Sequence, residues 1–426
     1  MSARNGKPLL RLGACAMALG FLALPAHATM GYFTLGGDAV ARAQGGAGVA
    51  APGANAMASA INPAAVAGMG REFSLGLEAF APSRGYDASG TAFVAPGRVR
   101  SGYYVFAIPN FAYNLPLANG AVLNIAAYAN GGANTLYPNV TNPNCGGGTG
   151  VFCNGEAGGD LSQLFLSFTY AQKTGNISWG IAPTIVGQRF KAYGVGSFAS
   201  LSSNSGALSG NGYDYSMGIG LRAGVQIQVT PLLSFGFTGQ TKMKMSKFKK
   251  YAGLFAGGGS FDVPAAATIG MAYKARPDLT LMADFERIFY SGVPALSNPF
   301  PNGTNPLGSA NGPGFGWSDV NVLKLGAVWQ QNAKMTWRFG YAHATNPVSP
   351  GGVTFNILAP AVVQNHFTMG GSYKMTTHDT MDFSVMYVPK NSVTGVEVTS
   401  TGPTAGSKIT DEMHQVAVSV GWTRTF

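Results

Sequence analysis

Hydrophobic and polar residues alternate along many short stretches of the chain, the period of a β-strand with two different faces. Between Ser162 and Tyr170, for example, Leu164, Leu166 and Phe168 occupy alternate positions. One face of such a strand suits lipid and the other tolerates water. The alternation predicts fourteen strands, at 72–81, 100–114, 120–130, 161–172, 177–191, 213–229, 232–249, 262–275, 279–290, 319–331, 334–345, 364–375, 380–389 and 414–426.

The connections between these strands alternate in length. Tight turns occupy 173–176, 230–231, 276–278, 332–333 and 376–379. Long segments rich in Gly, Pro, Ser, Thr and Asn occupy 131–160, 192–212, 291–318, 346–363 and 390–413. Short turns at one end, long loops at the other and an even number of strands are typical of a bacterial outer-membrane barrel. We therefore expect an all-β fold, a transmembrane antiparallel β-barrel of about fourteen strands formed by residues 71–426.

Composition excludes the main alternatives. Charged residues make up 10% of the 426-residue chain, against about 25% in an average soluble protein. After residue 28 no uncharged apolar run reaches the roughly 18 residues that suggest a membrane helix. With 26 Phe and 17 Tyr the chain also carries more aromatic surface than a disordered protein.

Residues 1–28 have the features of an export signal. Three cations precede an apolar stretch, and Ala26 and Ala28 form a small-x-small cleavage site. Removing them lowers the formal net charge from +10 to +7, because the segment holds three Lys or Arg and no acid. We expect a mature chain that begins at Thr29 in the outer membrane of a Gram-negative bacterium.

Residues 29–70 do not follow the strand pattern. Ala and Gly dominate them, so they can pack closely in short helical turns but cannot form a core of their own. Because fourteen strands enclose a lumen wider than their side chains fill, we expect this segment to be a hatch inside the barrel. A flexible periplasmic tail is the alternative.

Two cysteines remain in the mature chain. Cys145 and Cys153 lie in a Gly-, Asn- and Pro-rich stretch, and a pair in an exported protein favours a disulfide that closes a small loop. A metal site is the weaker alternative, because two thiols without a nearby His make a poor zinc set. We expect no metal and no cofactor.

The segment "GGAGVAAPGANAMASAINPAAVAGM" resembles the hatch of the long-chain fatty-acid outer-membrane transporters, the FadL family, which also includes importers of toluene and related hydrocarbons. The resemblance continues through 167–190, 261–291 and 357–390. It implies a monomeric fourteen-stranded barrel and passive uptake of hydrophobic molecules. Substrate would enter among the outer loops, bind in the lumen and leave sideways at a kinked third strand.

The same resemblance assigns candidate gate residues. Asn62, Pro63 and Ala64 match the Asn-Pro-Ala motif of the hatch, and Asn62-Pro63 is expected to end its last helical turn and direct the chain to the wall. An ordinary turn before the first strand is the other interpretation. Gly131 and Gly132, at the upper end of the third strand, are candidates for its kink.

A fatty acid needs an apolar groove and a cation for its carboxylate. If their strand is unbroken, Lys242 and Lys244 occupy the alternate positions whose side chains point into the lumen. Phe248, Leu254 and Phe255 follow them. These five residues are the candidate ligand site. Alternatively, the lysines lie at the outer rim and bind lipopolysaccharide phosphates. The cations that bind carboxylate in the family cannot be aligned to this chain residue by residue.

The resulting hypothesis is a passive channel for long-chain fatty acids or other hydrophobic compounds. A monoaromatic hydrocarbon importer and a structural or adhesive plugged barrel are the alternatives. An enzyme is not expected, because the four His of the mature chain are scattered and no Gly-x-Ser-x-Gly motif occurs. The expected partners are the substrate, outer-membrane lipid and lipopolysaccharide, and the barrel-assembly machinery, to whose signal the terminal Phe426 is similar. Nucleic acid is not expected.

Overall fold

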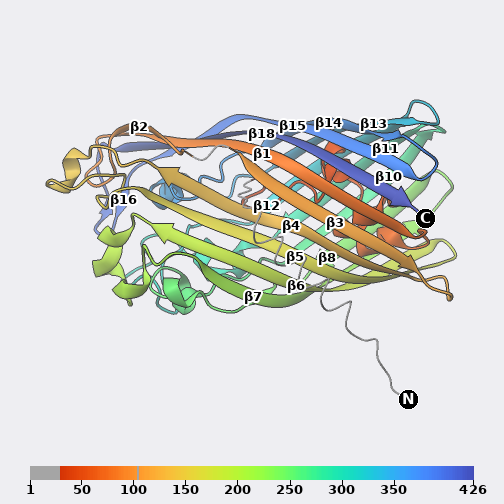
Figure 1. The fold of residues 1–426 in the computed structure, drawn as a ribbon. Coiled ribbons are helices and arrows are strands. Elements are labelled where there is room, and N and C mark those ends of the chain that lie inside the picture. The colour runs from red at the N-terminus through yellow and green to blue at the C-terminus, as the bar shows by residue number, and fades with distance from the viewer. Residues whose placement is uncertain (1–28, 103–104) are drawn as a thin grey trace, which may run out of the picture.

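The computed structural model describes residues 29–102 and 105–426, and the predicted export signal lies outside them (Figure 1). Within this part of the chain, fourteen long strands form one closed antiparallel sheet. They are β1 (Glu72–Ser89), β3 (Phe106–Pro116), β4 (Val122–Tyr137), β5 (Ala157–Thr174), β6 (Ile177–Tyr193), β7 (Asp214–Gln228), β8 (Leu233–Gln240), β10 (Ala266–Arg276), β11 (Leu279–Ile288), β12 (Val320–Gln330), β13 (Met335–Ala344), β14 (Asn365–Lys374), β15 (Asp379–Gly395) and β18 (Lys408–Thr425). β18 closes the barrel against the whole length of β1. The predicted barrel and its strand number are confirmed.

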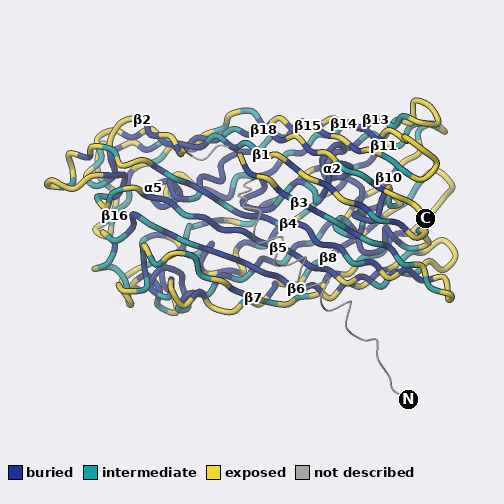
Figure 2. Tube along the Cα trace, in the orientation of Figure 1, coloured by how far each residue is buried: buried dark blue, intermediate teal, exposed yellow. Residues whose placement is uncertain are grey.

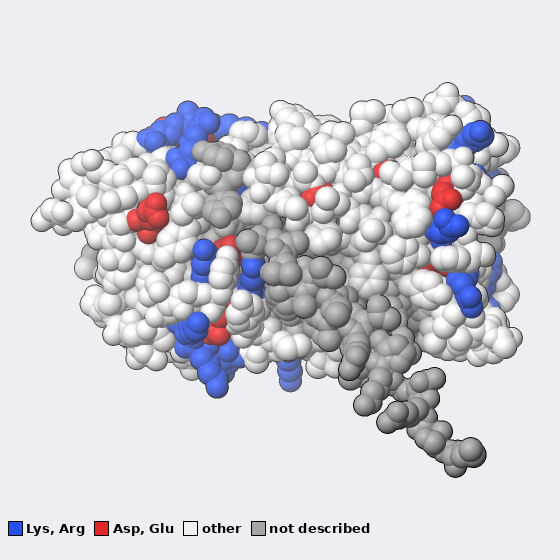
Figure 3. Space-filling view, viewed as in Figure 1, with Lys and Arg blue, Asp and Glu red and all other residues white. Residues whose placement is uncertain are grey.

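The last strand shows how the alternation produces the wall. Val416, Val418 and Val420 are exposed on the outer face of β18, and Ala417 and Ser419 between them are buried. An outer face that meets lipid disfavours charge, since Lys or Arg at mid-depth costs about 2–4 kcal/mol. Charged side chains are correspondingly sparse on the face shown in Figure 3 and gather mainly toward the two ends. Buried and exposed positions alternate along the strands in Figure 2.

One predicted strand is interrupted. The segment 232–249 ends as β8 at Gln240, and β9 (Lys244–Met245) pairs with β7. Met243 is fully buried between Lys242 and Lys244, which are both exposed. The alternation of the sequence continues across the break. The pattern therefore does not reveal that even-numbered residues face the lumen before the break and odd-numbered residues after it.

Another boundary differs beside β1. The strand predicted at 100–114 begins only at Phe106, and β2 (Gly97–Arg100) is a separate short strand paired with β1. A small hairpin of β16 (Val398–Thr399) and β17 (Gly402–Pro403) stands apart from the barrel sheet.

The segment before β1 lies inside the barrel, toward the end that carries the short turns (Figure 1, red to orange). It contains α2 (Ala39–Ala43) and the 3-10 helices η1 (Ala56–Ala60) and η2 (Pro63–Val66). Asp38 caps α2 by accepting from Ala41 N–H at 2.9 Å, and Asn55 caps η1 by accepting from Met57 N–H at 3.0 Å. We call residues 29–70 the hatch.

The long loops fold over the opposite end of the barrel. Their helical turns are η3 (Pro143–Cys145), η4 (Gly196–Leu201), η5 (Ser205–Ala207), η6 (Lys249–Tyr251), α3 (Ala256–Gly259), η7 (Tyr290–Gly292), α4 (Pro294–Ser297), η8 (Pro350–Gly352) and α5 (Val353–Asn356). A disulfide joins Cys145 and Cys153 in the first of these loops. Among the described residues, no helix is both long and apolar enough to span a membrane.

Candidate functional site: two cavities in the lumen

An apolar cavity lies inside the barrel beneath the long loops, with about 580 Å³ of empty space. The hatch, three neighbouring wall strands and three loops contribute its lining. The lining residues are Tyr32, Ala133, Gly158, Gly159, Leu161, Phe190, Ala192, Leu254, Phe255, Phe261, Leu296, Phe315, Trp317, Phe355, Leu358 and Ala359. No residue of this described lining carries a charge.

Aromatic rings form much of the wall of the apolar cavity. The ring centroids of Phe255 lie 4.7 Å from Phe190 and 4.8 Å from Phe261, and Phe315 and Phe355 lie 5.1 Å apart. These are the separations of favourable tilted ring pairs. The indole N–H of Trp317 donates to Asn356 Oδ1 at 2.6 Å, so this polar group is already bonded. The cavity therefore suits an apolar ligand with a ring or a compact hydrocarbon body.

Tyr32 and Phe33 separate the apolar cavity from a second one. Tyr32 lines the apolar cavity and Phe33 lines the other. The Tyr32 N–H donates to the Tyr290 hydroxyl at 3.1 Å, and that hydroxyl donates to the Met30 carbonyl at 2.6 Å. Burial raises the pKa of Tyr32, so its phenol stays protonated at neutral pH.

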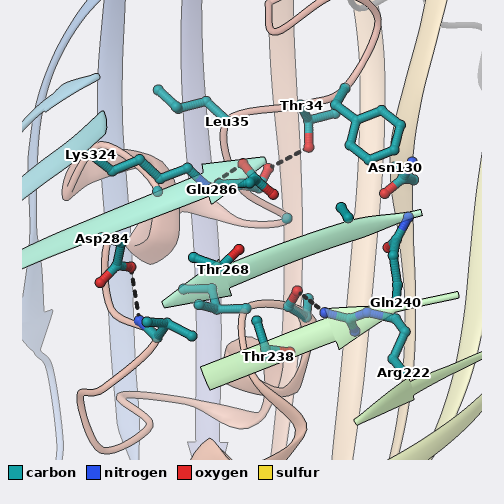
Figure 4. A pocket seen from close by; sticks show the side chains of 18 of the residues that line it. Thr34, Leu35, Asn130, Arg222, Thr238, Gln240, Thr268, Asp284, Glu286 and Lys324 are labelled. Carbon is teal, nitrogen blue, oxygen red and sulfur yellow. Dashed lines mark hydrogen bonds and ion pairs between the residues drawn. The ribbon is translucent and has the colours of Figure 1, made fainter. Parts of the chain in front are cut away.

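The second cavity is polar and lies between the hatch and the wall, with about 730 Å³ of empty space (Figure 4). Lys324 and Arg222 line it, and both are engaged. Lys324 Nζ lies 2.9 Å from Glu286 Oε2, and Arg222 donates to the Ala60 carbonyl at 2.6 Å and to the Tyr128 hydroxyl at 2.7 Å. Lys324 is thus already paired with a carboxylate, and Arg222 is bonded to the hatch and to Tyr128.

Buried carboxylates hold the body of the hatch against the wall. Asp284 accepts from the N–H groups of Gly48 at 2.7 Å and Val49 at 3.0 Å (Figure 4). Arg42 of α2 forms a buried ion pair with Glu78 of β1. Hydrogen bonds to charged groups contribute about 1.5–3 kcal/mol each, so these contacts favour a hatch body that stays in place.

The Asn-Pro-Ala motif of the hatch lies against the wall strands β6 and β7. Asn62 Nδ2 donates to the Val49 carbonyl at 2.7 Å, and Asn62 Oδ1 accepts from Ala64 N–H at 2.9 Å. A Cβ on Gly224 would fall 1.9 Å from Asn62 Oδ1, so a side chain there would displace the Asn62 amide. The expected end of the last helical turn at Asn62-Pro63 is wrong, because Pro63 begins a further turn, η2. Proline suits this first helical position since no N–H partner is needed there.

The third barrel strand, β4, is irregular at the predicted glycines. Its register with β5 shifts between Ala129 and Gly131. The hatch pairs with this bulge: Thr34 N–H donates to the Asn130 carbonyl at 3.0 Å, and Gly132 N–H to the Tyr32 carbonyl at 3.1 Å. A Cβ on Gly131 would fall 2.2 Å from the Tyr32 carbonyl oxygen, so a side chain there would displace the hatch.

Above this bulge the wall loses a pairing partner. Among the described residues, β3 pairs with β4 only up to Phe111 opposite Ala127, whereas β4 continues beside β5 to Tyr137. Higher up, Gly102 N–H donates to the Leu136 carbonyl at 2.7 Å. We call the stretch of β4 between these two contacts, residues 128–135, the seam, since it has no strand partner on its β3 side among the described residues. The N-terminal part of the hatch lies at the lower end of the seam.

The structure divides the predicted ligand residues into two groups. Leu254 and Phe255 line the apolar cavity, and the buried Phe248 packs on Phe255 with ring centroids 6.2 Å apart. Lys242 and Lys244 line neither cavity. Their inward direction had depended on an unbroken strand, and the break after Gln240 turns them to exposed positions.

Sequence reasoning missed most of the apolar lining. Phe190 was within a predicted strand, and its partners Phe315, Trp317 and Phe355 come from loops whose folding over the lumen leaves no periodic signal. Their aromatic character inside Gly- and Pro-rich loops was the one available indication. No group of three His, Cys, Asp or Glu among the described residues is arranged to hold a metal ion.

A closed fourteen-stranded barrel with an internal hatch and an apolar lumen cavity defines a class of outer-membrane channel. The chain belongs to the family described as outer membrane protein transport protein (OMPP1/FadL/TodX), whose model matches residues 32–426. It is therefore an outer-membrane channel of the hydrophobic-compound type and not an enzyme. No curated protein matches the chain significantly.

Solved structures share this fold at low sequence identity. The toluene transporter TodX of P. putida matches with a TM-score of 0.68 at 17% identity, over 92% of this chain and 99% of that one. The Ralstonia pickettii toluene transporter TbuX gives 0.63 at 20%, over 92% and 99%. A Pseudomonas aeruginosa FadL homologue gives 0.66 at 15%, over 93% and 100%.

Proposed function

We propose that this channel takes up neutral hydrophobic compounds, with monoaromatic hydrocarbons as the preferred class. The apolar, aromatic-walled cavity carries the proposal. A benzene ring can pack on Phe190, Phe255 and Phe355 in the tilted arrangements that the rings already adopt with one another. The toluene transporters with the same fold support this substrate class.

A long-chain fatty acid fits the lumen less well. Burying an ionised carboxylate without a partner costs several kcal/mol or more. The described lining of the apolar cavity offers no cation, and in the polar cavity Lys324 and Arg222 are already bonded. A fatty-acid carboxylate would have to compete with Glu286 for Lys324, or share Arg222 with the hatch carbonyl and the Tyr128 hydroxyl.

For the route, we propose entry among the long loops, binding in the apolar cavity and exit through the seam beside upper β4. Tyr32 and Phe33 lie between that cavity and the lower end of the seam. Their segment is held by few main-chain hydrogen bonds, whereas the hatch body is held by buried carboxylates. Movement of the segment at 29–37 as a unit, with the hatch body from Asp38 onward in place, would open the path.

Substrate uptake tests the proposal. Cells that lack other channels of this family and express this chain should take up radiolabelled toluene at least about fivefold faster than cells carrying an empty vector. Oleate uptake in the same cells should change by less than about twofold, because the described lining of the apolar cavity offers no cation to bind its carboxylate. Faster oleate uptake without a toluene effect would establish the fatty-acid alternative. If neither substrate is taken up faster, the result would favour the alternative of a structural or adhesive plugged barrel without a transport role.

A further inference from the structure

Two buried glutamines face each other just below the apolar cavity, although neither is among its lining residues. Gln163 of β5 lies opposite Gln188 of β6 in the sheet register, and their relative exposures are 3% and 0%. Leu161 and Phe190, two residues further along the same strands, line the apolar cavity. Because residues two apart on a strand share a face, both glutamines point into the lumen.

Most hydrogen-bonding atoms of this pair have no partner among the described residues. Neither Nε2 nor Oε1 of Gln188 forms a hydrogen bond, and the same holds for Nε2 of Gln163. Gln163 Oε1 accepts only a long bond from Asn130 Nδ2, at 3.5 Å. The Tyr32 hydroxyl lies close enough to Gln163 to interact with it and has no other hydrogen-bond partner among the described residues. Buried amides and hydroxyls are normally bonded, since an unmet group loses its hydration without compensation.

We propose that Tyr32, Gln163 and Gln188 form a polar end of the apolar cavity that binds the hydroxyl group of a neutral phenol. This rests on the proposed uptake of monoaromatic compounds and narrows it to hydroxylated rings such as p-cresol. The ring lies among the aromatic side chains above, and the hydroxyl reaches the glutamine pair.

The phenol hydroxyl and the glutamine side chains have complementary hydrogen-bonding groups. A phenol hydroxyl donates one hydrogen bond and accepts others, and a glutamine side chain offers both an acceptor oxygen and a donor nitrogen. A phenol with a pKa near 10 is uncharged at neutral pH, as the glutamines are, so no ion has to be buried. Toluene fills the same apolar space but leaves the amides unbonded, and such sites discriminate against the analogue that lacks the polar group.

The test compares p-cresol with toluene, which differ by one hydroxyl. Concentration-dependent uptake of both is measured in cells expressing the wild-type chain, Gln188→Leu or Gln163→Leu. Each leucine replaces an amide of similar size, so the apolar cavity above it is kept. We expect the half-saturating concentration of p-cresol to rise roughly fivefold or more in both variants, with the value for toluene unchanged or lower.

Gln415→Leu is the matched control, because Gln415 is also fully buried on a wall strand, but that strand, β18, contributes no residue to the lining of the apolar cavity. It should leave the p-cresol to toluene ratio at the wild-type value. Toluene uptake by each variant reports that the barrel is folded, and Tyr32→Phe, which removes only a hydroxyl, gives a second measurement of the same ratio.

Two results would overturn the inference. If wild type takes up toluene but Gln188→Leu, Gln163→Leu and Tyr32→Phe leave the p-cresol to toluene ratio unchanged, the polar end holds no more than water and the proposed function stands. If wild type takes up neither compound, the proposed function fails together with the phenol site.

Discussion

Ala133→Trp is expected to lower the initial rate of toluene uptake by at least about tenfold, because an indole at this position occupies the apolar cavity. Ala133 lies on β4 and its side chain lines the cavity. The strand is paired with β5 at this point, Ala133 opposite Leu161, so the backbone holds the new ring in the lumen. The rate is measured with radiolabelled toluene in cells matched for the amount of barrel in the outer membrane.

Leu123→Trp is the control for this substitution. Leu123 lies on the same strand but is 41% exposed on the outer wall, where an aromatic ring meets lipid. It should keep wild-type uptake. An Ala133→Trp barrel that takes up toluene as fast as wild type would mean that substrate does not pass through the apolar cavity.

In a Gly37→Cys, Tyr128→Cys double variant, formation of the disulfide is expected to reduce the rate of toluene uptake at least about tenfold. Reduction of the disulfide should restore the rate. A Cβ on Gly37 would lie 3.7 Å from the Tyr128 Cβ, within the range of disulfides. The bond ties the N-terminal part of the hatch to β4 just below the bulge. The segment at 29–37, which carries Tyr32 and Phe33, then cannot move as a unit away from the path to the seam.

The tether is made in a Cys145→Ser, Cys153→Ser background, so that the new pair is the one disulfide affected by the reductant. The single variants Gly37→Cys and Tyr128→Cys control for the loss of the tyrosine hydroxyl that binds Arg222. Equal rates before and after reduction, with the bond verified, would contradict exit past the N-terminal part of the hatch.

The barrel was predictable because its physical cause is local. Within each strand, apolar residues that face lipid alternate with small or polar residues that face the lumen. On β18 the lipid-facing residues are Val416, Val418 and Val420. The length of each turn or loop can also be read from the sequence alone. The number of strands, and which barrel end carries the long loops, could therefore be predicted without any long-range information. The break after Gln240 was not predictable, because Lys242 and Lys244 keep the alternation while the register with β7 shifts by one residue, from Arg222 opposite Gln240 to Ile219 opposite Lys244.

The candidate site was predictable only in part. Leu254 and Phe255 were recognised as apolar residues near the lumen, but Trp317 and Phe355 reach the cavity through loops that pack on each other over long sequence distances. Gln163 and Gln188 look like ordinary inward residues of two strands. Only the register that sets them opposite each other, below an apolar cavity, distinguishes them from the many polar residues of the lumen.

The most direct measurement is an X-ray structure of the protein with iodobenzene, a neutral monoaromatic compound whose iodine is located by anomalous scattering. An iodine peak inside the apolar cavity, within contact distance of Phe190, Trp317 or Phe355, is the predicted result. An occupied site in the polar cavity beside Lys324 with none among these rings, or no lumen site at all, would contradict a channel that binds neutral hydrophobic compounds there.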